Sequence, residues 1–236
     1  MLTMMGTVTT KPKKQKQTMA ERANTLRAGV LGANDGILTV VGVLFSVAAA
    51  TTDHFTIFIA GLADLLACAF SMASGEYASV SSQKDTEAAV VAGEARLLKD
   101  DPAAELHAVT NYYVRRGVTE ATAEQIATEL MHKDALGTVI RVKYQLQLGH
   151  FMNPWDAAFS SLVSAASGGI FPLVAMTFLP VAWQWPGTIL AVLFSVTLTG
   201  YLSAKFGDGL VKTAMTRNVI IGIITMIIHY GIGQLM

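Results

Sequence analysis

The run Gly61–Val80, GLADLLACAFSMASGEYASV, is long and apolar enough to cross a membrane, yet it contains two carboxylates. Asp64, Cys68, Met72 and Glu76 recur at every fourth position, so a helix would place them along one slowly drifting stripe. An uncompensated acid near the middle of a bilayer costs about 3 kcal/mol on insertion scales, and such acids usually face a pathway or a bound cation. Because carboxylate, thiol and thioether suit a transition metal better than Mg²⁺ or Ca²⁺, the stripe predicts a route for such an ion.

Most residues of this stripe also have a plainer interpretation. Helical cysteine and methionine more often pack than bind a ligand, so Cys68 and Met72 can be core residues. Glu76 is near the end of the run and can lie at the water interface. Asp64 has no such explanation, and the prediction therefore rests most heavily on it.

The composition places this run in an integral membrane protein. The chain has 236 residues, of which 52% are hydrophobic and only 14% charged, with a mean hydropathy of +0.46, which is too apolar for an ordinary soluble domain. Basic and acidic residues are equal at 17 each, so the net charge says nothing about partners. We expect no nucleic-acid partner. The single cysteine excludes an intramolecular disulfide.

The first span is predicted at residues 27–50, with Asp35 between Asn34 and Gly36. This triplet forms helix poorly, so we expect a local opening there that lines a polar cavity. The connection at residues 51–54 is very short, and the second span must therefore return antiparallel beside the first. That arrangement brings Asp35 into the same bundle as the stripe.

Three further spans are predicted at residues 155–179, 186–206 and 213–233. Gly168, Gly169 and Pro172 interrupt the third span and are expected to bend it. The resulting fold class is an all-α integral membrane protein with five transmembrane helices. The chain divides into a tail at 1–26, two spans within 27–83, a helical insert at 84–152 and three spans within 153–236.

The insert between spans two and three is charged and has helical periodicity without a span-length apolar run. We predict helices at 84–99, 102–116, 119–131 and 134–147. Asp101 is the expected N-cap of the second with Pro102 at its first position, and Thr119 and Asp134 cap the third and fourth.

The distribution of positive residues predicts the orientation. Six Lys and Arg lie in the N-terminal tail and at the start of the first span, and eight lie in the insert. The remaining three, Lys205, Lys212 and Arg217, lie in the connection between spans four and five and in the span ends beside it. By the positive-inside rule the N-terminus and the insert are cytosolic, and the C-terminus is outside or luminal. The rule fits a plasma membrane and a vacuolar-type membrane equally well.

Motifs in and beside the first, second, third and fifth spans resemble the vacuolar iron transporter family: Asn34-Asp35-Gly36, Gly61-Leu62-Ala63-Asp64-Leu65, Ser71-Met72-Ala73-Ser74-Gly75-Glu76-Tyr77, Ser81-Ser82-Gln83-Lys84-Asp85, Asn153-Pro154-Trp155 and Arg217-Asn218. The resemblance covers nearly the whole chain beyond about residue 21. The second-span motif is its most specific part.

This resemblance implies a homodimer with a pore between protomers, lined by the first two spans. It also implies a cytosolic metal-binding domain, and export of Fe²⁺, Mn²⁺ or another divalent transition metal from the cytosol in exchange for protons. Asp35 matches the first-span acid, and Asp64, Met72 and Glu76 fall in the second-span motif. The metal would enter near Glu76, pass Met72 and meet Asp35 and Asp64, and no permanently bound cofactor is expected.

The insert departs from the family pattern. The family places Glu pairs three residues apart on two helices, and a Met and a Glu on a later one. Here the pairs read Glu94 with Leu97 and Glu105 with Ala108, and the later positions fall near Val139 and Lys143. Fewer anionic ligands predict at most a weak cytosolic metal site at Glu94 and Glu105, which His107, Met131 and His132 could complete. The alternative is that these are solvated surface residues without a ligand role.

Two other functional classes fit parts of the sequence. One is a membrane-anchored metal sensor or scaffold that does not transport. The other is an intramembrane hydrolase that uses Asp35 and Asp64 as an acid–base pair. We favour a transporter, which is not an enzyme, and the absence of a Walker-type loop in the sequence gives no support for ATP drive.

Overall fold

The computed structural model describes residues 19–148 and 152–235, and all regular secondary structure in these residues is helical. The helices are α1 (Met19–Ala50), α2 (His54–Asp100), α3 (Pro102–Val114), α4 (Glu120–Tyr144), α5 (Pro154–Phe178), α6 (Val181–Phe206) and α7 (Val211–Gln234). Five of them, α1, α2, α5, α6 and α7, are long and apolar enough to cross a membrane. The predicted all-α architecture with five spans is confirmed, whereas the homodimer stays a prediction.

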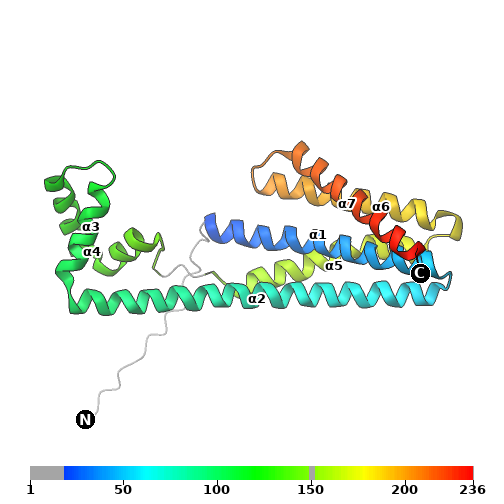
Figure 1. Ribbon diagram of the computed structural model, residues 1–236, viewed down its shortest axis with the longest axis horizontal. Coiled ribbons are helices and arrows are strands. Elements are labelled where there is room, and N and C mark those ends of the chain that lie inside the picture. Colours follow the sequence, from blue (N-terminus) through cyan, green and yellow to red (C-terminus); the bar gives the residue numbers. More distant parts are fainter. Residues whose placement is uncertain (1–18, 149–151, 236) are drawn as a thin grey trace, which may run out of the picture.

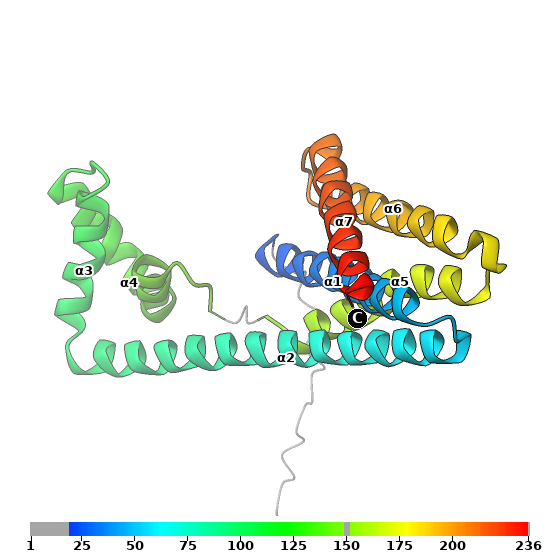
Figure 2. The same cartoon turned by 45° about the vertical axis from the view of Figure 1, so that its right-hand side comes forward.

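The helix α2 contains both the second span and the first helix of the insert. Its 47 residues extend over about 70 Å at the usual rise per residue, against about 30 Å of hydrocarbon in a bilayer. Figure 1 shows α2 running beneath the other spans and beyond them, with α3 and α4 at its far end, and Figure 2 shows the same separation. The predicted division at residues 83 and 84 therefore lies inside one uninterrupted helix.

Two of the three caps predicted in the insert make their hydrogen bonds, while Thr119 lies at the N-cap position of α4 without a side-chain cap bond. The carboxylate of Asp101 accepts a hydrogen bond from the backbone N–H of Ala104 at 3.0 Å, and Pro102 opens α3. Inside α4, Asp134 has non-helical backbone angles, and its carboxylate accepts the N–H of Gly137 at 3.0 Å. The third and fourth helices of the insert are therefore joined at a kink whose position the sequence predicts.

The helix α1 packs most extensively against α5, through small residues. A Cβ added to Gly32 would lie 2.6 Å from the carbonyl oxygen of Ser161, and one on Gly36 would overlap the backbone of Ala165. Small residues permit such close approach between membrane helices. The local opening predicted at Asn34-Asp35-Gly36 is wrong, because α1 is continuous there and the glycine serves helix packing.

No break interrupts the third span, since α5 is one helix from Pro154 to Phe178 with Pro172 inside it, and the expected bend stays a prediction. A Cβ on Gly168 would lie 2.6 Å from the carbonyl oxygen of Ala33, and one on Gly169 would lie 2.6 Å from that of Gly36. These glycines therefore allow contact with α1 rather than marking a break in α5.

The start of the fourth span was expected at Pro186, but α6 begins at Val181 and contains this proline. Trp185 packs edge-on against Phe45, with 5.0 Å between ring centroids, and against Tyr230 at 5.3 Å. Trp185 is therefore part of the packing between helices, whereas Trp183 of the same helix is exposed, as a residue at the membrane–water interface would be.

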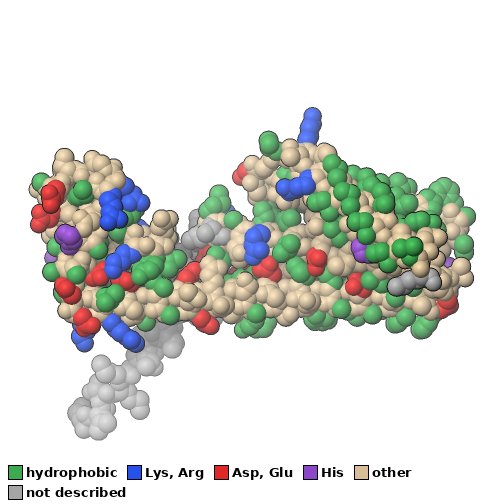
Figure 3. Space-filling model, viewed as in Figure 1, with side chains coloured by type: hydrophobic (Ala, Val, Ile, Leu, Met, Phe, Trp, Pro, Cys, Tyr) green, Lys and Arg blue, Asp and Glu red, His purple; other side chains and the backbone are tan. Residues whose placement is uncertain are grey.

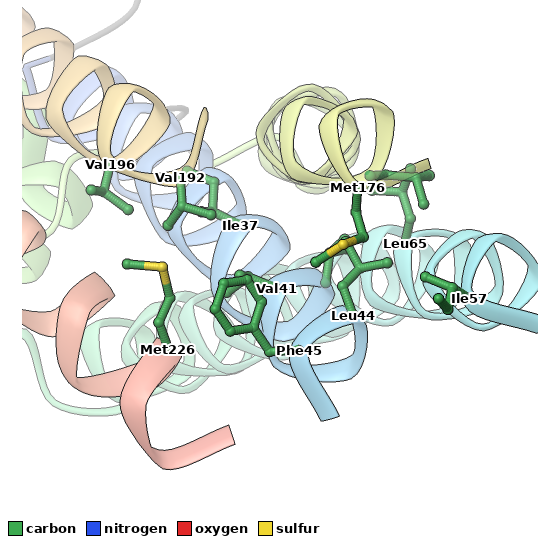
Figure 4. Packing of buried hydrophobic residues seen from close by; sticks show 12 residues of the cluster. Ile37, Val41, Leu44, Phe45, Ile57, Leu65, Met176, Val192, Val196 and Met226 are labelled. Carbon is green, nitrogen blue, oxygen red and sulfur yellow. The ribbon is translucent and has the colours of Figure 1, made fainter. Parts of the chain in front are cut away.

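The core of the membrane part surrounds α1. Fully or nearly fully buried side chains from all five spans meet there: Ile37, Val40, Val41, Leu44, Phe45, Ile57, Leu65, Leu173, Met176, Val192, Val196 and Met226. In Figure 4 the labelled residues of α1 lie between those of α6 and α7 on one side and those of α2 and α5 on the other. The insert has its own smaller core of Val109, Ala127, Val139 and Val142.

The outer surface changes character along the molecule. Figure 3 shows hydrophobic side chains over the five-helix part, while acidic and basic side chains gather at the end formed by α3 and α4. Large apolar side chains such as Phe159, Phe194 and Ile227 are exposed on α5, α6 and α7, as expected of helices that face lipid. The chain is therefore an integral membrane protein whose charged side chains gather on the helical insert.

Candidate functional site

The short turn between α1 and α2 sets the register of the two helices. Asp53 caps α2 by accepting the N–H of Thr56 at 3.0 Å, and α2 then returns along α1. Arg27 of α1 contacts Glu76 of α2. Eight residues later on α1, Asp35 contacts Cys68, which lies eight residues earlier on α2. This constant register aligns the acidic stripe of α2 with polar residues of α1.

Asp35, Asp64 and Cys68 form the central part of this site. The Cys68 thiol donates a hydrogen bond to Asp35 Oδ2 at 3.4 Å, and both aspartates interact electrostatically with Cys68. One oxygen of Asp64 and the hydroxyl of Thr39 are buried, and neither makes a hydrogen bond of normal length and angle among the described residues, although Thr39 lies close enough to interact with Asp64 and Cys68. Because buried polar atoms are nearly always well satisfied, these orphaned oxygens indicate a place for water or a cation between them.

Met72 lies one turn further along α2. Its half-buried side chain packs with Cys68, Ala69 and Ala165, where α2 meets α5. The packing interpretation of Met72 and Cys68 therefore holds, and it does not exclude a ligand role for either sulfur. The role of Met72 on an ion route stays a prediction.

Glu76 is the last acid of the stripe and is only 6% exposed. Its Oε2 accepts a hydrogen bond from Arg27 Nη2 at 3.1 Å, and the arginine side chain itself is about half exposed. Arg27 also donates to Asn24 Oδ1 at 3.2 Å. In the sequence, Arg27 counts only among the positive residues near the first span. The short turn expected at residues 51–54 fixes how α1 and α2 align, and this alignment could have predicted its pairing with Glu76.

The predicted site residues lie along one face of the α1–α2 pair, but they do not converge on one point. Within residues 19–148 and 152–235, no group of three or more His, Cys, Asp or Glu side chains is placed to hold a metal ion. One chain contributes the Asp35–Cys68 contact and the orphaned oxygen of Asp64, with Glu76 further along. The arrangement suits passing contact with a cation better than tight retention.

The insert brings together the two glutamates named as a weak metal site. Lys143 Nζ lies 2.9 Å from Glu94 Oε2, and 2.8 Å and 2.7 Å from the two carboxylate oxygens of Glu105. The Tyr144 hydroxyl donates to the other oxygen of Glu94 at 2.8 Å. Glu94 and Glu105 are 3% and 6% exposed, whereas Lys143 and Tyr144 reach them from the exposed side of the insert.

These contacts predict that the insert loses stability at alkaline pH. Burial lowers the pKa of Lys143, but its hydrogen bonds with Glu105 and Glu94 and their negative charges outweigh this effect, so its pKa lies above the ordinary value of 10.5. The hydrogen bond to Glu94, followed by burial, raises the pKa of Tyr144 above 10.0. Both groups hold their protons more tightly in the folded state. Their contribution is therefore fully present below about pH 10 and is lost as the pH rises through the folded pKa values.

The loss of stability of the insert at alkaline pH can be measured by limited digestion of the full chain with an alkaline protease from pH 8 to pH 11.5. We expect cleavage in α3 and α4 to begin at a higher pH in Lys143→Arg, since a guanidinium stays charged at these pH values. Equal cleavage of both proteins across the whole range would contradict the prediction.

Comparison with known proteins covers almost the whole chain. Residues 26–234 match the model of the VIT family. A vacuolar iron transporter of Acanthamoeba castellanii is 36% identical, over 94% of this chain and 82% of its own length. Vacuolar iron transporter homolog 5 of rice (Oryza sativa subsp. japonica) is 30% identical over 92% of this chain and 83% of its own, and homolog 2.1 of Arabidopsis thaliana is 27% identical over 95% and 88%.

Proposed function

The chain belongs to the VIT family, and from this premise we propose that it exports a divalent transition metal, Fe²⁺ or Mn²⁺, from the cytosol in exchange for protons. The observation that carries the proposal is the contact between Asp35 and Cys68 beside the orphaned oxygen of Asp64, inside two membrane helices. The hydrolase alternative is wrong, because the named relatives are transporters and not enzymes.

In the proposed route the metal enters at Glu76, passes Met72 and reaches Asp35 and Asp64. Glu76 is paired with Arg27, so the entering cation must displace a guanidinium. Further in, a carboxylate must lose its proton to bind the ion and can regain one when the ion leaves. This competition couples metal and proton movement without a nucleotide.

The proposed orientation places the insert and the N-terminus in the cytosol. The distribution of Lys and Arg along the sequence supports it. Figure 1 adds that the beginning of α1, the connection between α6 and α7, and the insert all lie toward the same end of the molecule. The C-terminus then faces the outside or the lumen of a vacuolar-type compartment.

A homodimer is part of the proposal. The single chain lacks a complete metal-binding group in the described residues, and large apolar side chains of α2, including Leu66 and Phe70, are exposed. A second copy against this face would bring a second Asp35 and Asp64 toward the same route. The pore would then lie between protomers.

Flux measured in proteoliposomes tests this function. The purified chain is reconstituted, and Fe²⁺, Mn²⁺, Co²⁺ and Zn²⁺ are compared with and without an imposed pH gradient. We expect flux of at least one metal above that of protein-free liposomes, accelerated by a proton gradient of opposite direction. Equilibrium binding of metal without any flux would favour the alternative of a membrane-anchored sensor or scaffold.

Removing Arg27 is expected to ease metal entry. In Arg27→Gln, the carboxylate of Glu76 loses its ion-pair partner and becomes free for the metal. Because the guanidinium is largely solvated, we expect the KM for metal to fall by only about two- to fivefold. Arg22→Gln, an exposed arginine of the same helix, is the control and should leave KM unchanged. A higher KM in Arg27→Gln would mean that Arg27 assists binding instead of blocking it.

A further inference from the structure

The contact of Lys143 with Glu94 and Glu105 joins three helices of the insert, α4, α2 and α3. Three carboxylate oxygens surround one ammonium group at 2.7 to 2.9 Å. Oxygen atoms from separate elements gathered around a single positive centre are the arrangement that also holds a divalent cation. Here a side chain of the protein supplies the positive charge.

The residues around this centre do not fit a divalent ion while Lys143 is present. An ion within bonding distance of the same oxygens would lie against the ammonium group, and the two positive centres would repel each other. The other candidates do not complete a site, since His107 and His132 are exposed and His107 is hydrogen-bonded to Asn111. No metal-holding group is present among the described residues of the insert.

We propose that Lys143 is the built-in cation of the insert. Its ammonium group occupies the place between α2, α3 and α4 that a divalent ion would take, keeps such ions out, and lets the three helices assemble without metal. Because the ammonium group occupies this place, the weak metal site predicted at Glu94 and Glu105 forms only when Lys143 is removed. This inference goes beyond the proposed transport function and does not depend on it.

The charge balance supports this assignment. Glu94 and Glu105 are almost fully buried, and two carboxylates facing each other without a cation would be strongly unfavourable. Lys143 neutralises one of the two charges, and the Tyr144 hydroxyl donates to the remaining oxygen of Glu94. Without Lys143 the pair would keep a formal charge of −2, which matches a divalent cation.

Hydrogen exchange on the full chain in lipid nanodiscs tests the proposal. Exchange is followed in α3 and the last turns of α4, in EDTA and in Mn²⁺. In the wild type we expect the same hydrogen-exchange rates in EDTA and in Mn²⁺. In Lys143→Met we expect the rate of exchange through opening of the insert to increase on the order of 100-fold in EDTA, since two buried carboxylates lose their cation. We expect it to fall at least tenfold when Mn²⁺ is added.

Two further variants locate the effect. Lys143→Met combined with Glu94→Gln should lose the response to Mn²⁺, because one carboxylate of the new site is gone. Lys133→Met, at an exposed lysine of the same helix, should behave as the wild type does. The measurement lies in the insert, so a failure of metal transport leaves it unaffected.

Three results would overturn the proposal. One is Mn²⁺-dependent protection of the wild-type insert, since the site would then accept metal beside Lys143. Another is wild-type exchange in Lys143→Met without metal, since the ammonium would then contribute nothing. The third is a destabilised Lys143→Met that Mn²⁺ does not protect, because the carboxylates would then not form a cation site.

Discussion

Asp35→Asn is expected to lower metal flux in proteoliposomes by on the order of 100-fold or more. Asparagine has nearly the same shape as aspartate, so the packing of α1 and the neighbouring Cys68 should be preserved. It lacks the negative charge that attracts the metal and the ability to exchange a proton for it. Even changes to residues behind metal ligands typically cost 10- to 100-fold, so if Asp35 is a ligand, as proposed, its removal should cost at least as much.

Asp208→Asn is the matched control for this substitution. Asp208 is exposed in the turn between α6 and α7 and has a positive φ of 51°, a conformation that asparagine also tolerates. The control should therefore fold and transport like the wild type. Full flux in Asp35→Asn, with its dependence on the pH gradient intact, would contradict the proposed mechanism.

Gly36→Ala is expected to destabilise the membrane domain by about 3 kcal/mol, as overpacking of a tight interface does. The added methyl group would overlap the carbonyl group of Ala165, and backbone atoms cannot rotate away as a side chain can. The helices α1 and α5 would have to separate, which loosens the core around Ile37. Thermal unfolding in detergent should show a fall in Tm on the order of 10 °C.

Gly231→Ala provides the comparison. Gly231 lies in α7, and nothing is within 4 Å of the position that its Cβ would take. Alanine should leave Tm unchanged there or raise it slightly, because it favours helix by up to about 1 kcal/mol over glycine. If Gly36→Ala melted with the wild type, the close approach of α1 and α5 described here would be wrong.

The features that could be predicted from the sequence are those set by short stretches of chain. Long apolar runs gave the five spans, and the four-residue spacing of Asp64, Cys68, Met72 and Glu76 placed them along one side of α2. Capping chemistry depends on three or four neighbouring residues, and the caps at Asp101 and Asp134 were therefore predictable.

The features that were missed depend on how helices meet. The triplet Asn34-Asp35-Gly36 forms helix poorly by itself, but the backbone of α5 packs on Gly36 and the helix continues. Similarly, the sequence showed a lysine where the family pattern has an acid. Only the packing of α2, α3 and α4 reveals that Lys143 lies between Glu94 and Glu105. Contacts between segments that are distant in sequence are not encoded in local spacing.

The uninterrupted length of α2 also makes it a lever. Over about 70 Å, a tilt of about 5° about its membrane end displaces the other end by about 6 Å. Small reorientations of the membrane-buried half are thereby amplified at α3 and α4, with which α2 shares its far end. Conversely, a partner bound to the insert acts far from the membrane end of α2, so a small force there is enough to tilt the half of α2 that carries Asp64.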